Sequence, residues 1–226
     1  MAMQLFSQRF RASRPGAVFR TAGLLLIVAA LSACSSLPTP PKEQLRYDLG
    51  LAPVAAAPVA SKLPPLTVAD VQAGVLAESS NNMLYRLAYA NAQELRPYQQ
   101  ARWAQPPAQL VQQRLRLLLA AQRPLLGSLD NVVANAQQQP TALLKVEIED
   151  FSQIFDSERN SRGVVQLRAT LMGMDAKGSN ILLGQRAFAA QVPATSADAA
   201  GGAKAIATAA DQALAELNSW LVGLGR

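Results

Sequence analysis

The carboxylates Glu147, Glu149 and Asp150 form a closely spaced group that could carry acid–base or metal chemistry. Such chemistry usually recruits histidine as a base or a ligand, and the 226 residues contain no histidine and one cysteine. Ser-His-Asp and Cys-His catalysis are thereby excluded, and few metal ligands remain. Glu147 and Glu149 also alternate with Val146 and Ile148, which is typical of the solvated face of a strand. We therefore expect no enzyme activity, no metal and no cofactor.

Cys34 is the lone cysteine, and it follows the short apolar run AGLLLIVAALSA (22–33). Residues 1–33 contain four arginines and no acidic residue, and this layout is typical of a secretory signal peptide. The run is shorter than the roughly 20 apolar residues of a membrane-spanning helix. The letters LSAC (31–34) resemble the bacterial lipobox, which implies acylation of Cys34, cleavage before it and a third acyl chain on the new amino group. Cys34 is therefore predicted to be a lipid anchor in a membrane.

Ser35 follows Cys34, at the position where aspartate is associated with retention in the inner membrane of enteric bacteria. By resemblance to that sorting rule, we expect the anchor in the periplasmic leaflet of the outer membrane. Residues 34–65 then combine the lipidated cysteine with stretches rich in Pro, Ala and Ser, a composition that favours an extended tether. The alternating letters LRYDLGL (45–51) predict a short strand within this region, and the folded domain is predicted over 66–226.

The formal net charge of +6 would suggest a nucleic-acid partner if the chain acted whole. Four of the 21 basic residues lie in the predicted signal peptide, which leaves 17 against 15 acidic residues and a net charge of +2. Most of the excess positive charge therefore lies in the predicted signal peptide, and we expect no binding of nucleic acid.

The remaining pattern predicts one α+β domain. Strands are expected over 65–76, 82–91, 141–155, 164–175 and 181–192, the last three as an antiparallel meander. A helix is expected over 106–122, with a buried stripe and with Arg114 and Arg116 at positions of little consequence for stability. The chain should end in a second long helix after residue 196. The predicted fold is a mixed, largely antiparallel sheet with two long helices packed on one face. The apolar stripe of the first helix consists of Val111, Leu115, Leu118 and Leu119.

Four aromatic residues are candidate contacts for a partner or a lipid, because aromatic side chains are enriched at interfaces. They are Tyr85, Tyr89, Tyr98 and Trp103. For Tyr85 and Tyr89, which would share a strand face with Leu87, core packing is the default, and a protein interface or a lipid pocket stays open. Trp220, near the end of the last helix, is expected to cover the sheet.

Several stretches in order along the chain carry a family resemblance. They are LSAC, YDLGLAP (47–53), MLYRLAY (83–89) with Tyr85, RWAQPPAQLVQQRL (102–115) with Trp103 and Pro107, LKVEIEDFSQIF (144–155) with Phe151, LMGMDAKGSNILLGQRAF (171–188) with Phe188, and NSWL (218–221). Together they resemble the ABC-type transport auxiliary lipoprotein family, which includes lipoproteins similar to paraquat-inducible protein C. The resemblance covers essentially all of the chain after Cys34.

The resemblance implies an accessory subunit of an inner-membrane ABC transporter that carries an MCE (mammalian cell entry) protein in the periplasm. Such systems are associated with moving phospholipids or other hydrophobic molecules across the envelope. An MCE-domain protein is therefore the expected partner, and assembly of several copies of the chain stays open. The alternative is a structural envelope-assembly lipoprotein that binds an outer-membrane protein or peptidoglycan.

Overall fold

The computed structural model describes residues 43–51, 63–74, 80–127, 141–175 and 177–225. The predicted signal peptide, Cys34 and most of the predicted tether lie outside these residues. The compact unit begins at Glu43, earlier than the predicted boundary at 66. Its first strand, β1 (Leu45–Tyr47), pairs in parallel with a strand of the sheet, and Leu49 is buried in the core. Residues 43–51 are therefore part of the folded domain.

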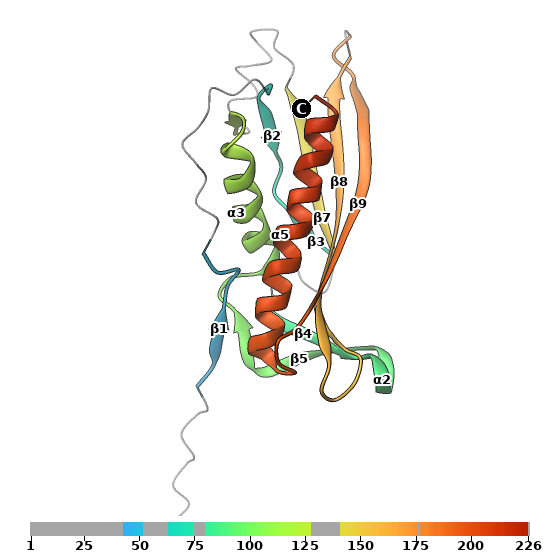
Figure 1. Ribbon diagram of the computed structural model, residues 1–226. Helices are drawn as coiled ribbons and strands as arrows, with labels where there is room; N and C mark the ends of the chain where they lie inside the picture. Colours follow the sequence, from blue (N-terminus) through green and yellow to red (C-terminus); the bar gives the residue numbers. More distant parts are fainter. Residues whose placement is uncertain (1–42, 52–62, 75–79, 128–140, 176, 226) are drawn as a thin grey trace, which may run out of the picture. The chain divides into compact units, whose positions relative to one another are not determined.

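Three long strands form the antiparallel meander that the sequence predicts: β7 (Ala142–Phe155), β8 (Ser161–Met174) and β9 (Asn180–Pro193) (Figure 1). Val146 lies opposite Ala169, and Leu167 lies opposite Phe188. Buried residues alternate in the first half of β7 and the second half of β8, as the period of two requires, whereas residues 151–153 and 163–165 are buried consecutively. In the β8–β9 turn, the Asp175 carboxylate accepts hydrogen bonds from the backbone N–H groups of residues 177 and 179 at 2.8 Å.

Short strands pair in parallel with the other edge of β7. β2 (Leu66–Val68), β3 (Gln72–Ala73) and β4 (Asn82–Leu87) pair with successive parts of β7, and β6 (Leu125–Leu126) pairs with β2. The single strand predicted over 65–76 is therefore two strands. Its interruption has a visible cause, because the N–H of Val71 donates to the side chain of Gln112 at 2.7 Å and so leaves the ladder.

The strand predicted over 82–91 ends early. β4 stops at Leu87, and a single helical turn, α2 (Ala88–Asn91), leads into β5 (Ala92–Trp103), which runs antiparallel to β4. The sequence did not predict β5, because Glu94, Arg96 and Pro97 interrupt any apolar alternation. β1 pairs with the end of β5, so that the nine strands form one mixed sheet.

Two long helices complete the α+β fold, α3 (Pro107–Ala120) and α5 (Ala199–Gly223). Asp198 caps α5 by accepting the N–H of Gly201 at 2.8 Å. α5 runs along the meander (Figure 1). It approaches β8 so closely at Gly163 that a Cβ there would lie 2.3 Å from the backbone N of Ile206, and only glycine leaves room for this approach. α3 lies beside α5 and packs against β3 and β6. No helix in the described ranges is long and apolar enough to cross a membrane.

Candidate partner-binding groove

Two of the four predicted aromatic contact residues lie together. Tyr85 on β4 and Tyr98 on β5 have ring centroids 4.6 Å apart. Tyr85 also meets Phe155 of β7 edge-on, with centroids 5.8 Å apart. Both tyrosines are half-buried, so each ring has one side in the protein and another toward solvent. This pair joins three strands and is the aromatic base of the candidate site.

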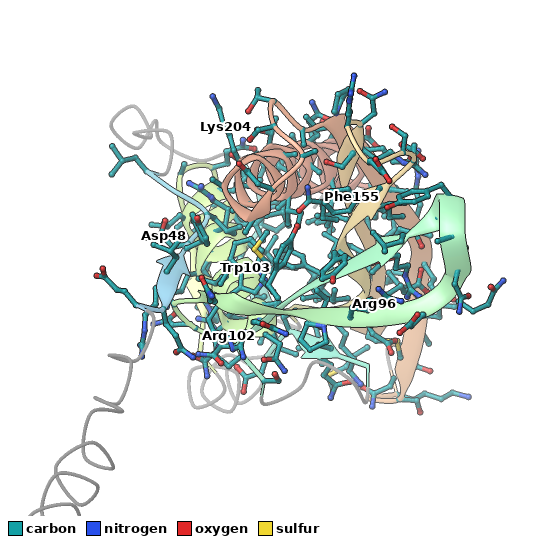
Figure 2. All side chains as sticks on the ribbon, turned by 90° about the horizontal axis from the view of Figure 1, so that it is seen from below. Asp48, Arg96, Arg102, Trp103, Phe155 and Lys204 are labelled. Atoms are coloured by element: carbon teal, nitrogen blue, oxygen red, sulfur yellow. The ribbon has the colours of Figure 1, made fainter. Side chains whose placement is uncertain are left out.

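The other two predicted residues lie elsewhere. Tyr89 belongs to α2 and is 48% exposed, so the expectation that it shares a buried strand face with Tyr85 is wrong. Trp103 is fully buried and meets Phe151 edge-on, with ring centroids 5.2 Å apart. Figure 2 shows Trp103 near the centre of the molecule. Trp103 is therefore a core residue and offers no surface to a partner.

A bulge in β5 positions Tyr98. Leu84 of β4 lies opposite Pro97, whereas Asn82 lies opposite Arg102, so residues 98–101 have no regular partners on β4. The Arg102 guanidinium lies inside this bulge and donates to the backbone carbonyls of Tyr98 and, at 2.9 Å, Ala101. Bulges bend a strand and re-aim its side chains. Here the bend turns Tyr98 toward Tyr85 and the start of α5.

A buried hydrogen-bond relay fixes the Tyr98 ring. Its hydroxyl donates to Gln153 Oε1 at 2.8 Å, and Gln153 Nε2 donates to Ser161 Oγ at 2.8 Å. Gln153 is fully buried, and a Cβ on Gly202 of α5 would lie 1.8 Å from Gln153 Oε1. Burial, followed by the neighbouring Tyr85, raises the pKa of Tyr98. The hydroxyl therefore stays protonated and acts as a donor.

Around this pair the surface is hollowed. We call the hollow the Tyr85–Tyr98 groove, and its volume is about 670 Å³. Arg96 is on its rim and pairs with Glu94 at 2.5 Å, so the groove carries no unpaired charge among its lining residues. Aromatic rings, amide side chains and a proline suit contact with a protein or an amphiphile more than with a strongly charged ligand. The groove is lined by Leu45, Tyr85, Arg96, Pro97, Tyr98, Gln99, Gln100, Ala101 and Ala199.

The three carboxylates considered first have different surroundings. Glu147 is exposed, and Glu149 accepts a hydrogen bond from Arg168 Nε at 2.6 Å. Asp150 accepts the Ser152 hydroxyl at 2.6 Å. The ranges that the structure describes contain no group of three or more His, Cys, Asp or Glu side chains placed to hold a metal.

Sequence reasoning missed the role of Arg114. We expected a position of little consequence, but this side chain is only 7% exposed. Its Nε lies 3.1 Å from Asp211 Oδ1 of α5, and its guanidinium donates to the carbonyl of Leu49 and, at 3.4 Å, to that of Gly50. Arg114 therefore joins the first segment of the domain to both long helices. A signal was present, because Arg114 follows Val111 by three residues, which is the spacing of the buried stripe.

A comparison with known protein families identifies the family of this chain. A family model described as the ABC-type transport auxiliary lipoprotein component matches residues 47–218, well over half of the chain. The chain belongs to this family. The match begins at Tyr47, the last residue of β1, and ends near the end of α5, so it includes every residue that lines the Tyr85–Tyr98 groove except Leu45.

Two solved structures resemble this auxiliary lipoprotein in fold. Protein XCC0632 from Xanthomonas campestris, assigned to family DUF330, is 20% identical with a TM-score of 0.58, and the match covers 77% of this chain and 95% of that one. An uncharacterized protein is 16% identical with a TM-score of 0.56, and the match covers 80% of this chain and 99% of that one. No curated protein gives a significant match. At these identities the solved structures support the fold alone.

Proposed function

We propose that this auxiliary lipoprotein is the accessory subunit of an MCE-type ABC transporter that moves phospholipid or other hydrophobic molecules across the envelope. The observation that carries the proposal is the family match over residues 47–218. Transport auxiliary components work with other subunits, and a partner protein is therefore required. In this proposal the partner is the periplasmic MCE-domain protein of the same transporter.

The chain acts by binding, without chemistry of its own. Acylated Cys34 holds it at the periplasmic leaflet of the outer membrane, and the segment after Cys34 is the tether. The Tyr85–Tyr98 groove supports a docking role, because two half-buried tyrosines fixed by the relay through Gln153 present rigid aromatic surface at low entropic cost. Leu45, two residues after the domain begins at Glu43, also lines the groove.

Affinity purification of the full-length lipoprotein from solubilised envelopes tests this proposal. We expect the MCE-domain protein to co-purify, and we expect Pro97→Asp or Gln99→Asp at the groove to reduce its recovery several-fold. Gln113→Asp is the matched control, because Gln113 is exposed on α3 away from the groove. Recovery of only peptidoglycan or an outer-membrane barrel would contradict the transport role and favour a structural role in envelope assembly.

A further inference from the structure

The free edge of β9 differs from every other edge of the sheet. β9 spans Asn180–Pro193 and, among the described residues, pairs with β8 alone. One edge of β7 is covered by β2, β3 and β4, and the edge of β5 is interrupted by its bulge and ends against β1. Strands average about five to six residues, and natural proteins keep unpaired edges short, charged or bulged. β9 is an exposed edge of 14 residues.

The hydrogen-bond register shows which backbone groups face outward. The N–H of Ala194 donates to the carbonyl of Ser161 at 2.8 Å, which makes these two residues a hydrogen-bonded antiparallel pair. In such a ladder every second residue turns both its N–H and its C=O toward the partner strand. The backbone groups of Phe188, Ala190 and Val192 therefore face β8, and those of the residues that alternate with them face the free edge. Pro193, which has no N–H, occupies one of the outward positions. The outward residues of the regular part of β9 are Gln185, Ala187, Ala189 and Gln191.

These four residues give a continuous row of backbone donors and acceptors. Their stretch, 185–191, corresponds to about 23 Å of extended chain at roughly 3.3 Å per residue. All four side chains are exposed, and none is charged, so no like-charge barrier opposes an added strand. The bulge that could blunt the edge lies between Leu182 and Gly184, outside this stretch.

Arg186 is the one charged residue within 185–191, and its charge narrows the kind of segment that fits the edge. Arg186 lies with its guanidinium carbon 5.3 Å from the centroid of the Phe188 ring, and it has no carboxylate partner among the described residues. A carboxylate on an added strand could pair with it at the surface. The edge therefore fits an extended, mostly uncharged segment with one acidic residue.

We propose that the β9 edge binds an extended segment of the partner protein, about seven residues long, by adding it to the sheet as a further strand. This inference rests on the proposed function, because it takes the MCE-domain protein as the partner. Main-chain hydrogen bonds to residues 185–191 provide the contact, and Arg186 selects an acidic residue in the segment. The site is separate from the Tyr85–Tyr98 groove, none of whose lining residues belongs to β9.

Ala189→Pro tests the edge directly. Proline removes the outward N–H and places its ring in the path of an added strand, while the ladder to β8 does not use this N–H. Ala189→Ser is the matched control, because it keeps the donor. With the full-length lipoprotein in detergent and the purified periplasmic region of the MCE protein, we expect Ala189→Pro to weaken binding at least tenfold and Ala189→Ser to change it less than twofold.

A photo-cross-linking residue at Ala187 provides a second test that does not depend on the folding of the proline variant. We expect a cross-link to the MCE protein from position 187 and none from Gln113, which is exposed on α3. Equal binding by Ala189→Pro and no cross-link from 187 would overturn the edge proposal while leaving the proposed function intact. Failure of the wild-type lipoprotein to bind the MCE protein would contradict both the edge proposal and the proposed function. A cross-link only between two copies of the chain would show that a second copy occupies the edge and would overturn the choice of partner.

Discussion

The hydroxyl of Tyr98 and the side-chain carbonyl of Gln153 are 2.8 Å apart, and this hydrogen bond ties the bulged strand β5 to a fully buried residue near the end of β7. Gln153 passes the connection to Ser161 on β8. The Tyr98 ring that lines the candidate groove is therefore held by buried residues as well as by its contact with Tyr85. Rigid placement of this kind reduces the entropy lost when a partner binds.

Tyr98→Phe should lower the free energy of unfolding by about 1–2 kcal/mol, because Gln153 Oε1 loses its donor while the ring stays. Chemical denaturation followed by circular dichroism measures the change. Tyr89→Phe is the control, since Tyr89 is on the surface of α2, and it should change stability by less than about 0.5 kcal/mol. Equal effects of the two substitutions would show that the Tyr98 relay does not stabilise the fold.

Arg114→Ala should destabilise the domain by about 2–3 kcal/mol, the range for losing hydrogen bonds to a charged group. The substitution removes the link between the Leu49 and Gly50 carbonyls and Asp211. Arg116 on the same helix is exposed and donates to one carbonyl at 3.2 Å, so Arg116→Ala should cost less than about 1 kcal/mol. Thermal and urea unfolding measure both. A larger loss for Arg116→Ala would contradict the role assigned to Arg114.

Asp198 gives a prediction about pH. The N–H of Gly201 and the hydroxyl of Ser196 stabilise its charged form and lower its pKa. Because the pKa is lower in the folded state, this carboxylate stabilises the fold above its unfolded pKa, about 4, and the effect is lost as the pH falls through the folded value. Asp198→Ala should cost about 1 kcal/mol at pH 7 through loss of the helix cap.

The difference in the free energy of unfolding between Asp198→Ala and the wild type should become smaller when urea unfolding is repeated near pH 3. Asp198→Asn keeps a capping oxygen, so it should lie near the wild type at pH 7. A difference that is the same at both pH values would rule out a role for the charged carboxylate.

The anchor prediction lies outside the described residues and needs a chemical test. Wild-type chain expressed with labelled palmitate should incorporate the label, and Cys34→Ala should not, because the Cys34 thiol is the predicted acylation point. In Cys34→Ala, the signal peptide should also not be cleaved before residue 34. Incorporation of equal label by both proteins would refute lipidation at Cys34.

Elements with a regular apolar period could be predicted from the sequence, and elements that depend on distant contacts could not. Buried residues alternate in the first half of β7 and the second half of β8, and in α5 the apolar residues recur at helical spacing, so their burial left a periodic signal. β5 carries no such signal, since it is held by an antiparallel partner on one side and by an arginine inside its bulge. The break between β2 and β3 depends on Gln112, which is 41 residues away from Val71 in the sequence. Contacts of this kind appear only after the chain has folded.

The candidate site was predictable in part for a similar reason. Tyr85 and Tyr98 were identified by residue type, but nothing local indicates that a bulge brings their rings within 4.6 Å. Trp103 and Arg114 were misjudged in the same way, because residue type predicts average burial and tertiary packing decides the individual case. The free edge of β9 leaves no sequence signal, since an edge is defined by the absence of a neighbouring strand.

The central claim is that this lipoprotein works by binding while anchored, without chemistry of its own. Complementation of a deletion strain, scored as resistance to detergents and other membrane-active compounds, tests it most directly. We predict that the triple variant Glu147→Ala, Glu149→Ala, Asp150→Ala restores resistance nearly as well as the wild type, and that Cys34→Ala fails because a released domain no longer holds its partner at the membrane. A triple variant that folds, reaches the membrane and binds its partner but does not restore resistance would contradict the claim.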